Sequence, residues 1–263
     1  MIYIYDGTFD GFLTCIYQNY YDAKATKIYR DEAWQMNVLE EHLHITTDPD
    51  KATRVYKGLH DRLSEKALEE VFYAFLSNDS GKENYLMDFI RLAFKVGIKI
   101  DSMYSHAAVL PIREIVQRVM SEKHRFMGIL RFKDTGSCLY AEYAPDHNIT
   151  GLLAPFFCER LANERFIIHD VRRKIAAVYY KKWYLTDFEL SQPLSITSAE
   201  VEIAALWQHY FDTAAVESRI NPRLQRSCLP RRYWRFLTEM QHKSKPYSAN
   251  IVVNDKIQIS SFS

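Results

Sequence analysis

The hydrophobic pattern predicts a strand, a helix and two further strands near the start of the chain. Ile and Tyr alternate over residues 1–5, which is typical of a short strand. Apolar side chains from Phe9 to Tyr17 then recur at the spacing of one helical face. Short β-type runs follow at 25–29 and 43–46. The chain therefore begins with a small α/β region.

The stretch 48–123 follows the helical period almost throughout. Asp48 or Asp50 can cap a first helix, and a second begins at Ser64. Further helices are expected over 85–96 and 112–120. We interpret this stretch as a helical insertion.

From Phe126 the hydrophobic period shortens to two, which predicts strands. Strands over 126–132 and 139–143 flank the turn residues Thr135 and Gly136, as in a hairpin. A helix over 152–161 and strands over 165–169 and 175–180 follow. The pattern predicts a β-β-α-β-β antiparallel module.

The last part of the chain predicts a linker and a capped helix. Residues 192–197 read as the linker, and Thr197 and Glu200 have the spacing of a capping box. A basic helical segment follows, and a weak strand pattern covers 251–259.

These elements together predict an α+β fold. We expect residues 1–190 to form the core, with the helical insertion at 48–123. Residues 191–263 would form a C-terminal helical segment and tail packed on that core.

Composition narrows the class of protein. With 48% hydrophobic and 25% charged residues, the chain has the balance of a globular protein. Its formal charge of +1 means that any polyanion-binding surface must come from local clustering. None of the four cysteines forms a C-x-x-C pair, which argues against a disulfide framework, a zinc site and an iron–sulfur cluster. We expect a cytoplasmic protein with no membrane span, bound metal or cofactor.

The basic segment is the most informative feature. Six arginines and no acidic residue lie between 219 and 235. Arginines can contact phosphates, and aromatic rings among them can stack on bases. A solvated helix that pairs with acidic surfaces elsewhere is the alternative. The candidate nucleic-acid-binding residues are Arg172, Arg173, Arg226, Arg231, Arg232, Tyr233, Trp234 and Arg235.

Two polar turns supply candidate catalytic residues. His169 and Asp170 come before the basic turn 172–174, and Asp146, His147 and Asn148 follow the 139–143 strand. Histidine and carboxylates can exchange protons or bind a metal. Asp and Asn also stabilise ordinary turns, which is the simpler reading of both segments. The candidate catalytic residues are His169, Asp170, His147 and Asp146, with Asn148 beside them.

The N-terminal strand runs directly into its helix through Asp6, Gly7 and Thr8. Such a junction can hold an anion on free backbone amides. Asp6 and Asp10 could also bind a metal or act as acid and base, although helix capping is the simpler explanation. Tyr5, Asp6, Thr8 and Asp10 are therefore candidate pocket residues.

The sequence as a whole resembles a bacterial family of unknown function labelled putative DNA metabolism protein. The matching segments are YDGTFDGFLTCIY, RFMGILRF, LYAEYAPDHNI, LLAPFFCERL, FIIHDVRR and NPRLQRSCLPRRYWRFLTE. Members of that family are encoded beside a radical-SAM protein, and a similar domain elsewhere is fused to a uracil-DNA-glycosylase-like domain. The resemblance implies DNA modification or repair, with the chemistry in a partner.

Three hypotheses follow. The first is an accessory nucleic-acid-binding protein that acts with a radical-SAM or glycosylase-like partner. The second is a nucleic-acid-processing enzyme that uses His/Asp acid–base or metal-assisted chemistry, although no known catalytic motif is present. The third is a structural adaptor without nucleic-acid contact.

Overall fold

The computed structural model describes residues 1–263 except 23, 35–39, 244–251 and 254–263. Its contacts divide the chain into two compact units, Met1–Ser121 and Glu122–Ser263. Both units mix helices with strands, so the predicted α+β class is confirmed. The division falls within a helix, whereas the sequence placed its boundary near residue 190.

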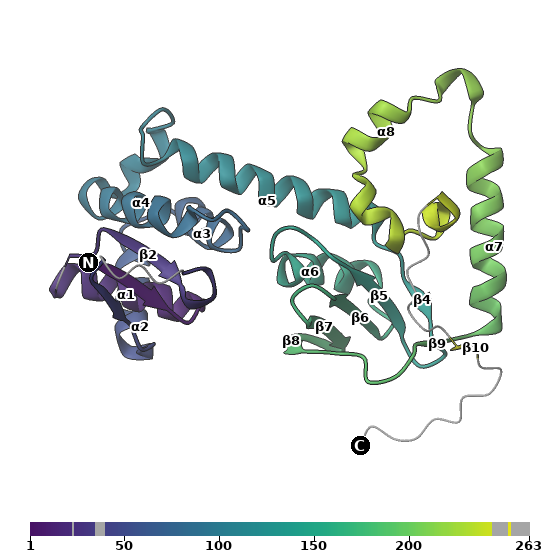
Figure 1. The fold of residues 1–263 in the computed structure, drawn as a ribbon, viewed down its shortest axis with the longest axis horizontal. Coiled ribbons are helices and arrows are strands. Elements are labelled where there is room, and N and C mark those ends of the chain that lie inside the picture. The colour runs from purple at the N-terminus through teal and green to yellow at the C-terminus, as the bar shows by residue number, and fades with distance from the viewer. Residues whose placement is uncertain (23, 35–39, 244–251, 254–263) are drawn as a thin grey trace. The chain divides into compact units, whose positions relative to one another are not determined.

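The first unit contains a three-stranded parallel sheet and the predicted helices (Figure 1). The sheet order is β2-β1-β3. Its strands are β1 (Ile2–Tyr5), β2 (Lys27–Arg30) and β3 (His42–His44). Its helices are α1 (Phe9–Tyr21), α2 (Pro49–His60), α3 (Glu65–Phe75), α4 (Lys82–Val96) and the first part of α5 (Leu110–Ile129), with short 3₁₀ turns at Asp31–Ala33 and Gly97–Ser102.

Polar caps fix the starts of these helices. Thr8 accepts a hydrogen bond from the amide of Gly11 at 3.0 Å and caps α1. Asp48 caps α2, and Ser64 caps α3. The caps satisfy amides that lack partners in the first helical turn. Of the two caps expected for α2, Asp48 is the one the structure uses, and the start expected at Ser64 is confirmed.

The second unit is built on a five-stranded mixed sheet of order β4-β5-β6-β7-β8. The strands are β4 (Lys133–Asp134), β5 (Leu139–Tyr143), β6 (Phe166–Asp170), β7 (Ile175–Tyr180) and β8 (Lys182–Asp187). Helix α6 (Thr150–Arg160) connects β5 to β6 and packs on one face of the sheet. Because α6 is a crossover connection, β5 and β6 run parallel.

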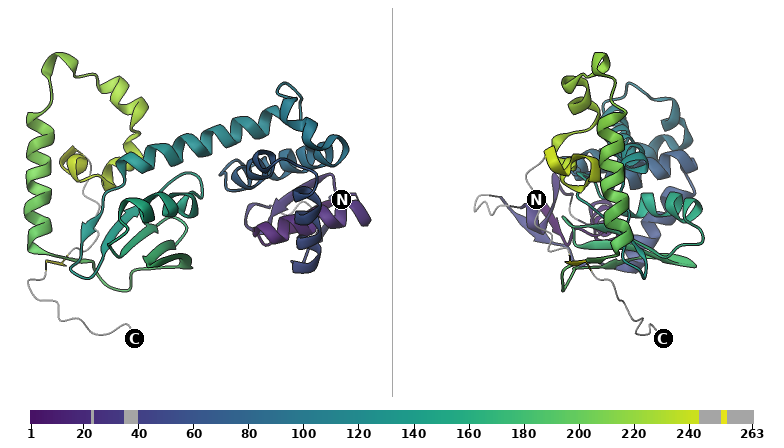
Figure 2. Two further views of the ribbon diagram at one scale, coloured as in Figure 1. Left: turned by 180° about the vertical axis from the view of Figure 1, so that it is seen from behind. Right: turned by 90° about the vertical axis from the view of Figure 1, so that its right-hand side faces the viewer.

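After the sheet, the chain forms a helical arch that leaves the strands and returns to them (Figures 1 and 2). A short strand β9 (Ser195–Ile196) pairs with β10 (Val252–Val253). The arch itself consists of α7 (Ser198–Thr213), a 3₁₀ turn at Glu217–Arg219, α8 (Pro222–Cys228), η4 (Arg231–Phe236) and η5 (Thr238–Lys243). The rest of the predicted 251–259 strand lies outside the described residues.

Two local predictions are wrong, and one strand was missed. Residues 126–129 belong to α5 and form no strand, because Val119, Glu122 and Phe126 form one buried helical stripe. The module is mixed rather than antiparallel, because β5 and β6 pair in parallel. Strand β8 was not anticipated, because its side chains are mostly exposed and its sequence lacks clean alternation.

Candidate nucleic-acid interface

The parallel pairing of β5 and β6 places the ends of both strands at one edge of the sheet. Tyr143, the last residue of β5, lies opposite Asp170, the last residue of β6. The turns that follow the two strands are therefore neighbours. This edge of a parallel sheet is where α/β proteins commonly place ligands.

Asp170 organises the turn after β6. Its side chain is fully buried, and one carboxylate oxygen accepts hydrogen bonds from the amides of Arg172 at 3.0 Å and Arg173 at 3.2 Å. The other oxygen accepts one from the Arg173 guanidinium at 2.8 Å. Asp170 is therefore a turn anchor whose charge is neutralised within the turn.

Arg173 connects this turn to the turn after β5. Its guanidinium donates to the carbonyl oxygens of Pro145 at 3.2 Å and Asp146 at 2.5 Å. From the other side, the buried carboxylate of Glu122 accepts hydrogen bonds from the amides of Asp146 and His147, both at 2.8 Å. The turn after β5 is thus held by Glu122 of α5 on one side and by Arg173 on the other.

The η4 segment completes the arrangement. Tyr233 donates a hydrogen bond to Glu122 at 2.6 Å, and its ring packs against Phe126 with centroids 4.8 Å apart. Its neighbour Arg232 pairs with Asp146 at 2.5 Å. Three segments that are distant in sequence therefore meet around Asp146.

We call Arg172, Arg173, Arg232 and Asp146 the arginine cluster. Arg172 and Arg232 each have side chains that are 52% exposed, and both lie beside the one carboxylate of Asp146, Arg172 at 3.9 Å. Partial burial alone would lower the pKa of Arg232, but Tyr233 and Asp146 raise it, so the guanidinium stays charged. Two exposed cations share one anion, which leaves positive charge for an external anion.

Other arginines of the basic segment add to this charge. Arg226 and Arg231 are exposed and form no ion pair with a described residue. Arg231 lies over the ring of Trp234 at 5.6 Å, and the half-buried Arg235 lies over Phe236 at 4.5 Å. Arg219 and Arg223 are likewise exposed and make no ion pair within the described part of the chain.

The two aromatic residues predicted to stack on bases are buried. Tyr233 is 1% exposed, and burial followed by the contact with Glu122 raises its pKa. Trp234 packs in a small cluster with Leu237 and Met240, and its indole donates to the Leu229 carbonyl at 2.9 Å. Both rings hold the basic segment in place, so neither is available for stacking in this structure.

His169 does not join the arginine cluster. Adjacent residues of a strand point to opposite faces, so His169 lies on the face opposite Asp170. There it contacts the Tyr140 hydroxyl at 2.6 Å and packs edge-on against Phe188. Burial lowers its pKa, and the nearby carboxylates of Glu142 and Asp170 oppose this without offsetting it. The candidate catalytic residues His169 and Asp170 therefore lie on different sides of the sheet.

His147 and Asn148 lie half-buried in the turn that Glu122 holds. They take part in the turn, in line with the simpler of the two readings that the sequence left open. Among the described residues, no group of three or more His, Cys, Asp and Glu side chains is arranged to hold a metal ion.

The N-terminal candidates belong to the first unit, and their polar groups are used internally. Asp6 accepts hydrogen bonds from the amide and hydroxyl of Thr8 at 2.9 and 2.7 Å, and from Thr47 at 2.7 Å. Burial alone would raise the pKa of Asp6, but these hydrogen bonds lower it below its usual value. The carboxylate thus occupies the position that an external anion would take.

Tyr5 and Asp10 are also separate from any shared site. Tyr5 is buried and donates to Glu83 at 3.1 Å, and Glu83 in turn pairs with Arg30 at 3.0 Å. Asp10 is exposed in the first turn of α1, where a negative charge stabilises the helix.

Glu122 was missed by sequence reasoning, although it holds the site together. The expected strand over 126–132 hid its position on the buried face of α5. The signal that could have found it is the helical spacing of Val119, Glu122 and Phe126.

The chain matches a family model described as a domain of unknown function (DUF4130) over residues 80–239, more than half of its length. Comparisons with curated proteins and with solved structures give no match. The matched range contains the whole arginine cluster. Separately, within the described residues no helix has the length and apolar character needed to cross a membrane.

Proposed function

The chain belongs to the family of the DUF4130 domain, and we propose that it is an accessory nucleic-acid-binding protein in DNA modification or repair. The observation that carries the proposal is the arginine cluster. Half-exposed Arg172 and Arg232 share a single carboxylate, and the neighbour of Arg232 in sequence, Arg231, is also an exposed arginine. A guanidinium group is suited to the phosphates of a nucleic acid, because it can donate two parallel hydrogen bonds to one phosphate.

The charge of the second unit supports this assignment. Residues 122–263 contain 20 Lys and Arg against 15 Asp and Glu, while residues 1–121 contain 14 against 18. The near-neutral total therefore conceals a basic unit that contains the cluster. A polyanion would be attracted to this unit over a distance of about 10 Å at moderate salt.

The proposed partner performs the chemistry. His169 and Asp170 point to opposite faces of the sheet, and Asp146 is paired with Arg232, which supports placing the chemistry in the partner. Within the proposal, the protein acts in the cytoplasm and presents DNA to a radical-SAM or glycosylase-like enzyme. The protein would contact the phosphate backbone of the DNA and not its bases, because the aromatic side chains of η4 that could stack on bases are buried.

The test is a salt-dependent anisotropy titration with labelled single- and double-stranded DNA. We expect the full-length protein to bind at low salt, with affinity falling steeply as salt rises. The variant Arg172→Gln/Arg231→Gln/Arg232→Gln should reduce the slope of log K against log salt by about 2 to 3, for three lost phosphate contacts.

A matched control removes the same charge elsewhere in the second unit. Arg160, Arg165 and Lys182 are exposed and lie outside the cluster, so their replacement by Gln should leave most of the slope intact. Equal losses in both triple variants would show that only net charge matters. Absence of binding at low salt would reject the proposal for the protein alone.

A further inference from the structure

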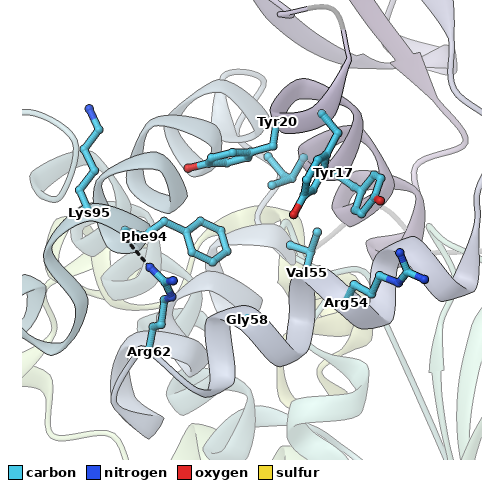
Figure 3. A pocket seen from close by; sticks show the side chains of 10 residues that line it. Tyr17, Tyr20, Arg54, Val55, Gly58, Arg62, Phe94 and Lys95 are labelled. Carbon is cyan, nitrogen blue, oxygen red and sulfur yellow. Dashed lines mark hydrogen bonds between the residues drawn. The ribbon is translucent and has the colours of Figure 1, made fainter.

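The first unit contains a cavity of about 640 Å³ that none of the predicted site residues lines. It lies between α1, α2 and the end of α4 (Figure 3). Its volume is within the range of about 300–1,000 Å³ that small-molecule sites occupy. The cavity is therefore large enough for a ligand of the size of a nucleotide.

Aromatic rings form much of its wall. Tyr17, Tyr20 and Phe94 face the space between the helices (Figure 3). Tyr20 and Phe94 meet edge to face with centroids 5.5 Å apart, and Tyr20 is 49% exposed, so part of its side chain is accessible from solvent. The planar ring of a nucleobase can stack on such an aromatic surface.

Three cationic residues and no acidic residue belong to the lining of the cavity. Arg54, Arg62 and Lys95 belong to the lining, although the unit as a whole carries more acidic than basic residues. None of the three pairs with a carboxylate among the described residues. Arg62 is positioned by a hydrogen bond to the Phe94 carbonyl at 2.9 Å. The local charge is thus opposite to that of its surroundings.

Gly58 keeps the cavity open on the α2 side. A Cβ atom at this position would lie 3.3 Å from Cε1 of Phe94. Any larger side chain would therefore push the Phe94 ring or fill the space beside it. The absence of a side chain on α2 preserves room next to the aromatic wall.

We infer that this cavity is a binding site for a nucleoside phosphate, either free or as one unpaired nucleotide of a strand. The base would stack on the wall formed by Tyr20 and Phe94. The phosphate would be held by Arg54 and Arg62 at the rim. This inference is independent of the proposed role of the arginine cluster, because the two sets of residues lie in different units.

The test is calorimetric titration of the full-length protein with adenosine 5′-monophosphate, adenosine and a short oligodeoxyadenylate. We expect the monophosphate to bind more tightly than the nucleoside. Tyr20→Ala should weaken binding by roughly 5- to 100-fold, as for the loss of one stacked base. Arg54→Gln should weaken it by about two- to fivefold at an exposed ion pair, with adenosine unaffected.

Two further kinds of variant separate binding from folding. Gly58→Leu should block the cavity while it improves helix propensity on α2, so binding should be lost without loss of the folded state. Tyr56→Ala and Lys66→Gln replace exposed residues outside the cavity and should bind as the parent does.

The titrations are repeated in the Arg172→Gln/Arg231→Gln/Arg232→Gln background, which removes DNA binding at the arginine cluster. Binding of the oligonucleotide that persists there and depends on Tyr20 identifies the ligand as part of a strand. Binding of the monophosphate alone identifies a free nucleotide. The inference is overturned if neither binds, if adenosine binds equally well, or if folded Tyr20→Ala and Gly58→Leu variants retain full affinity.

Discussion

At the scale of single residues, the polar groups buried in the second unit are held by internal partners. Glu122 accepts two backbone hydrogen bonds and one from Tyr233, and Asp170 accepts three from its own turn. A buried carboxylate is tolerated only when hydrogen bonds or an ion pair replace its contacts with water. These residues therefore position the arginine cluster, and their loss should be seen first in stability.

Replacement of Glu122 by Leu should destabilise the protein by about 3 kcal/mol. The amides of Asp146 and His147 would lose their acceptor, and the Tyr233 hydroxyl would lose its partner. Urea unfolding of the variant measures the change.

Tyr233→Phe is the matched comparison for Glu122→Leu, because it removes one of these hydrogen bonds and leaves both amides satisfied. It should cost about 1 kcal/mol. If the two variants prove equally stable, Glu122 does not hold the turn.

The stability contributed by His169 should depend on pH. Burial lowers its pKa in the folded protein, so the folded state binds a proton less readily than the unfolded state. This contribution is complete above the unfolded pKa of about 6.5 and is lost as the pH falls through the folded pKa. The unfolding free energy of the parent should therefore fall relative to that of His169→Gln below pH ~6.5.

The measurement is a series of urea titrations of both proteins between pH 8 and pH 5. Taking the difference between the two proteins removes the effect of the other histidines. The difference changes by at most about 1.4 kcal/mol per pH unit for one proton. A difference that stays constant over this range would mean that His169 titrates alike in both states.

At the scale of elements, the junction between β1 and α1 depends on a helical glycine. A Cβ atom at Gly11 would lie 2.3 Å from Oδ1 of Asp6 and 2.7 Å from the Thr47 hydroxyl. Asp6 cannot move without breaking its bonds to Thr8 and Thr47. The close approach of strand end and helix therefore requires glycine here.

Gly11→Ala should lower the melting temperature, although alanine is the better helix former by about 1 kcal/mol. The control is Gly128→Ala in α5, where a Cβ atom would meet nothing within 4 Å. That change should raise stability by up to about 1 kcal/mol. Differential scanning calorimetry of both variants should give shifts of opposite sign, and shifts of the same sign would contradict the packing argument.

The elements also show what the sequence could predict. Helices with a capping residue and a clear apolar face, such as α2 and α3, were found with their starts. Periodicity failed at 126–132, where alternate apolar residues near the end of α5 imitate a strand. Strand direction was missed although its signal was present: the helix predicted over 152–161 separates the two strands, and such a crossover makes β5 and β6 parallel. The residues of the site were proposed, but the convergence of their two turns, which follows from the parallel pairing, was not.

At the scale of the whole molecule, the two units have separate cores and opposite charge. One apolar cluster is formed by buried residues between Tyr3 and Ile115, and the sheet of the second unit lies outside it. Acidic residues are in excess in the first unit and basic residues in the second. Each unit therefore has its own source of stability and its own electrostatic character.

Leu86→Ala should destabilise the first unit selectively. Leu86 is fully buried in α4, and removal of such a side chain costs about 2 to 5 kcal/mol. Hydrogen exchange should quicken throughout residues 1–121, while the amides of β5 to β7 keep their protection. Ile168→Ala, in the core of the second unit, should give the reverse pattern. Uniform loss of protection in either variant would indicate a single cooperative unit.

The ion pair between Arg232 and Asp146 has a consequence for regulation. If DNA binds at the arginine cluster as proposed, an incoming phosphate would have to displace Asp146 from the Arg232 guanidinium, because the two already form an ion pair. The apparent affinity is then the difference between two ion pairs, and Asp146 acts as a tethered competitor. Asp146→Asn should tighten DNA binding in the anisotropy titration, whereas an inert Asp146 would leave it unchanged. Any ligand or partner that draws Asp146 away would serve as an activator.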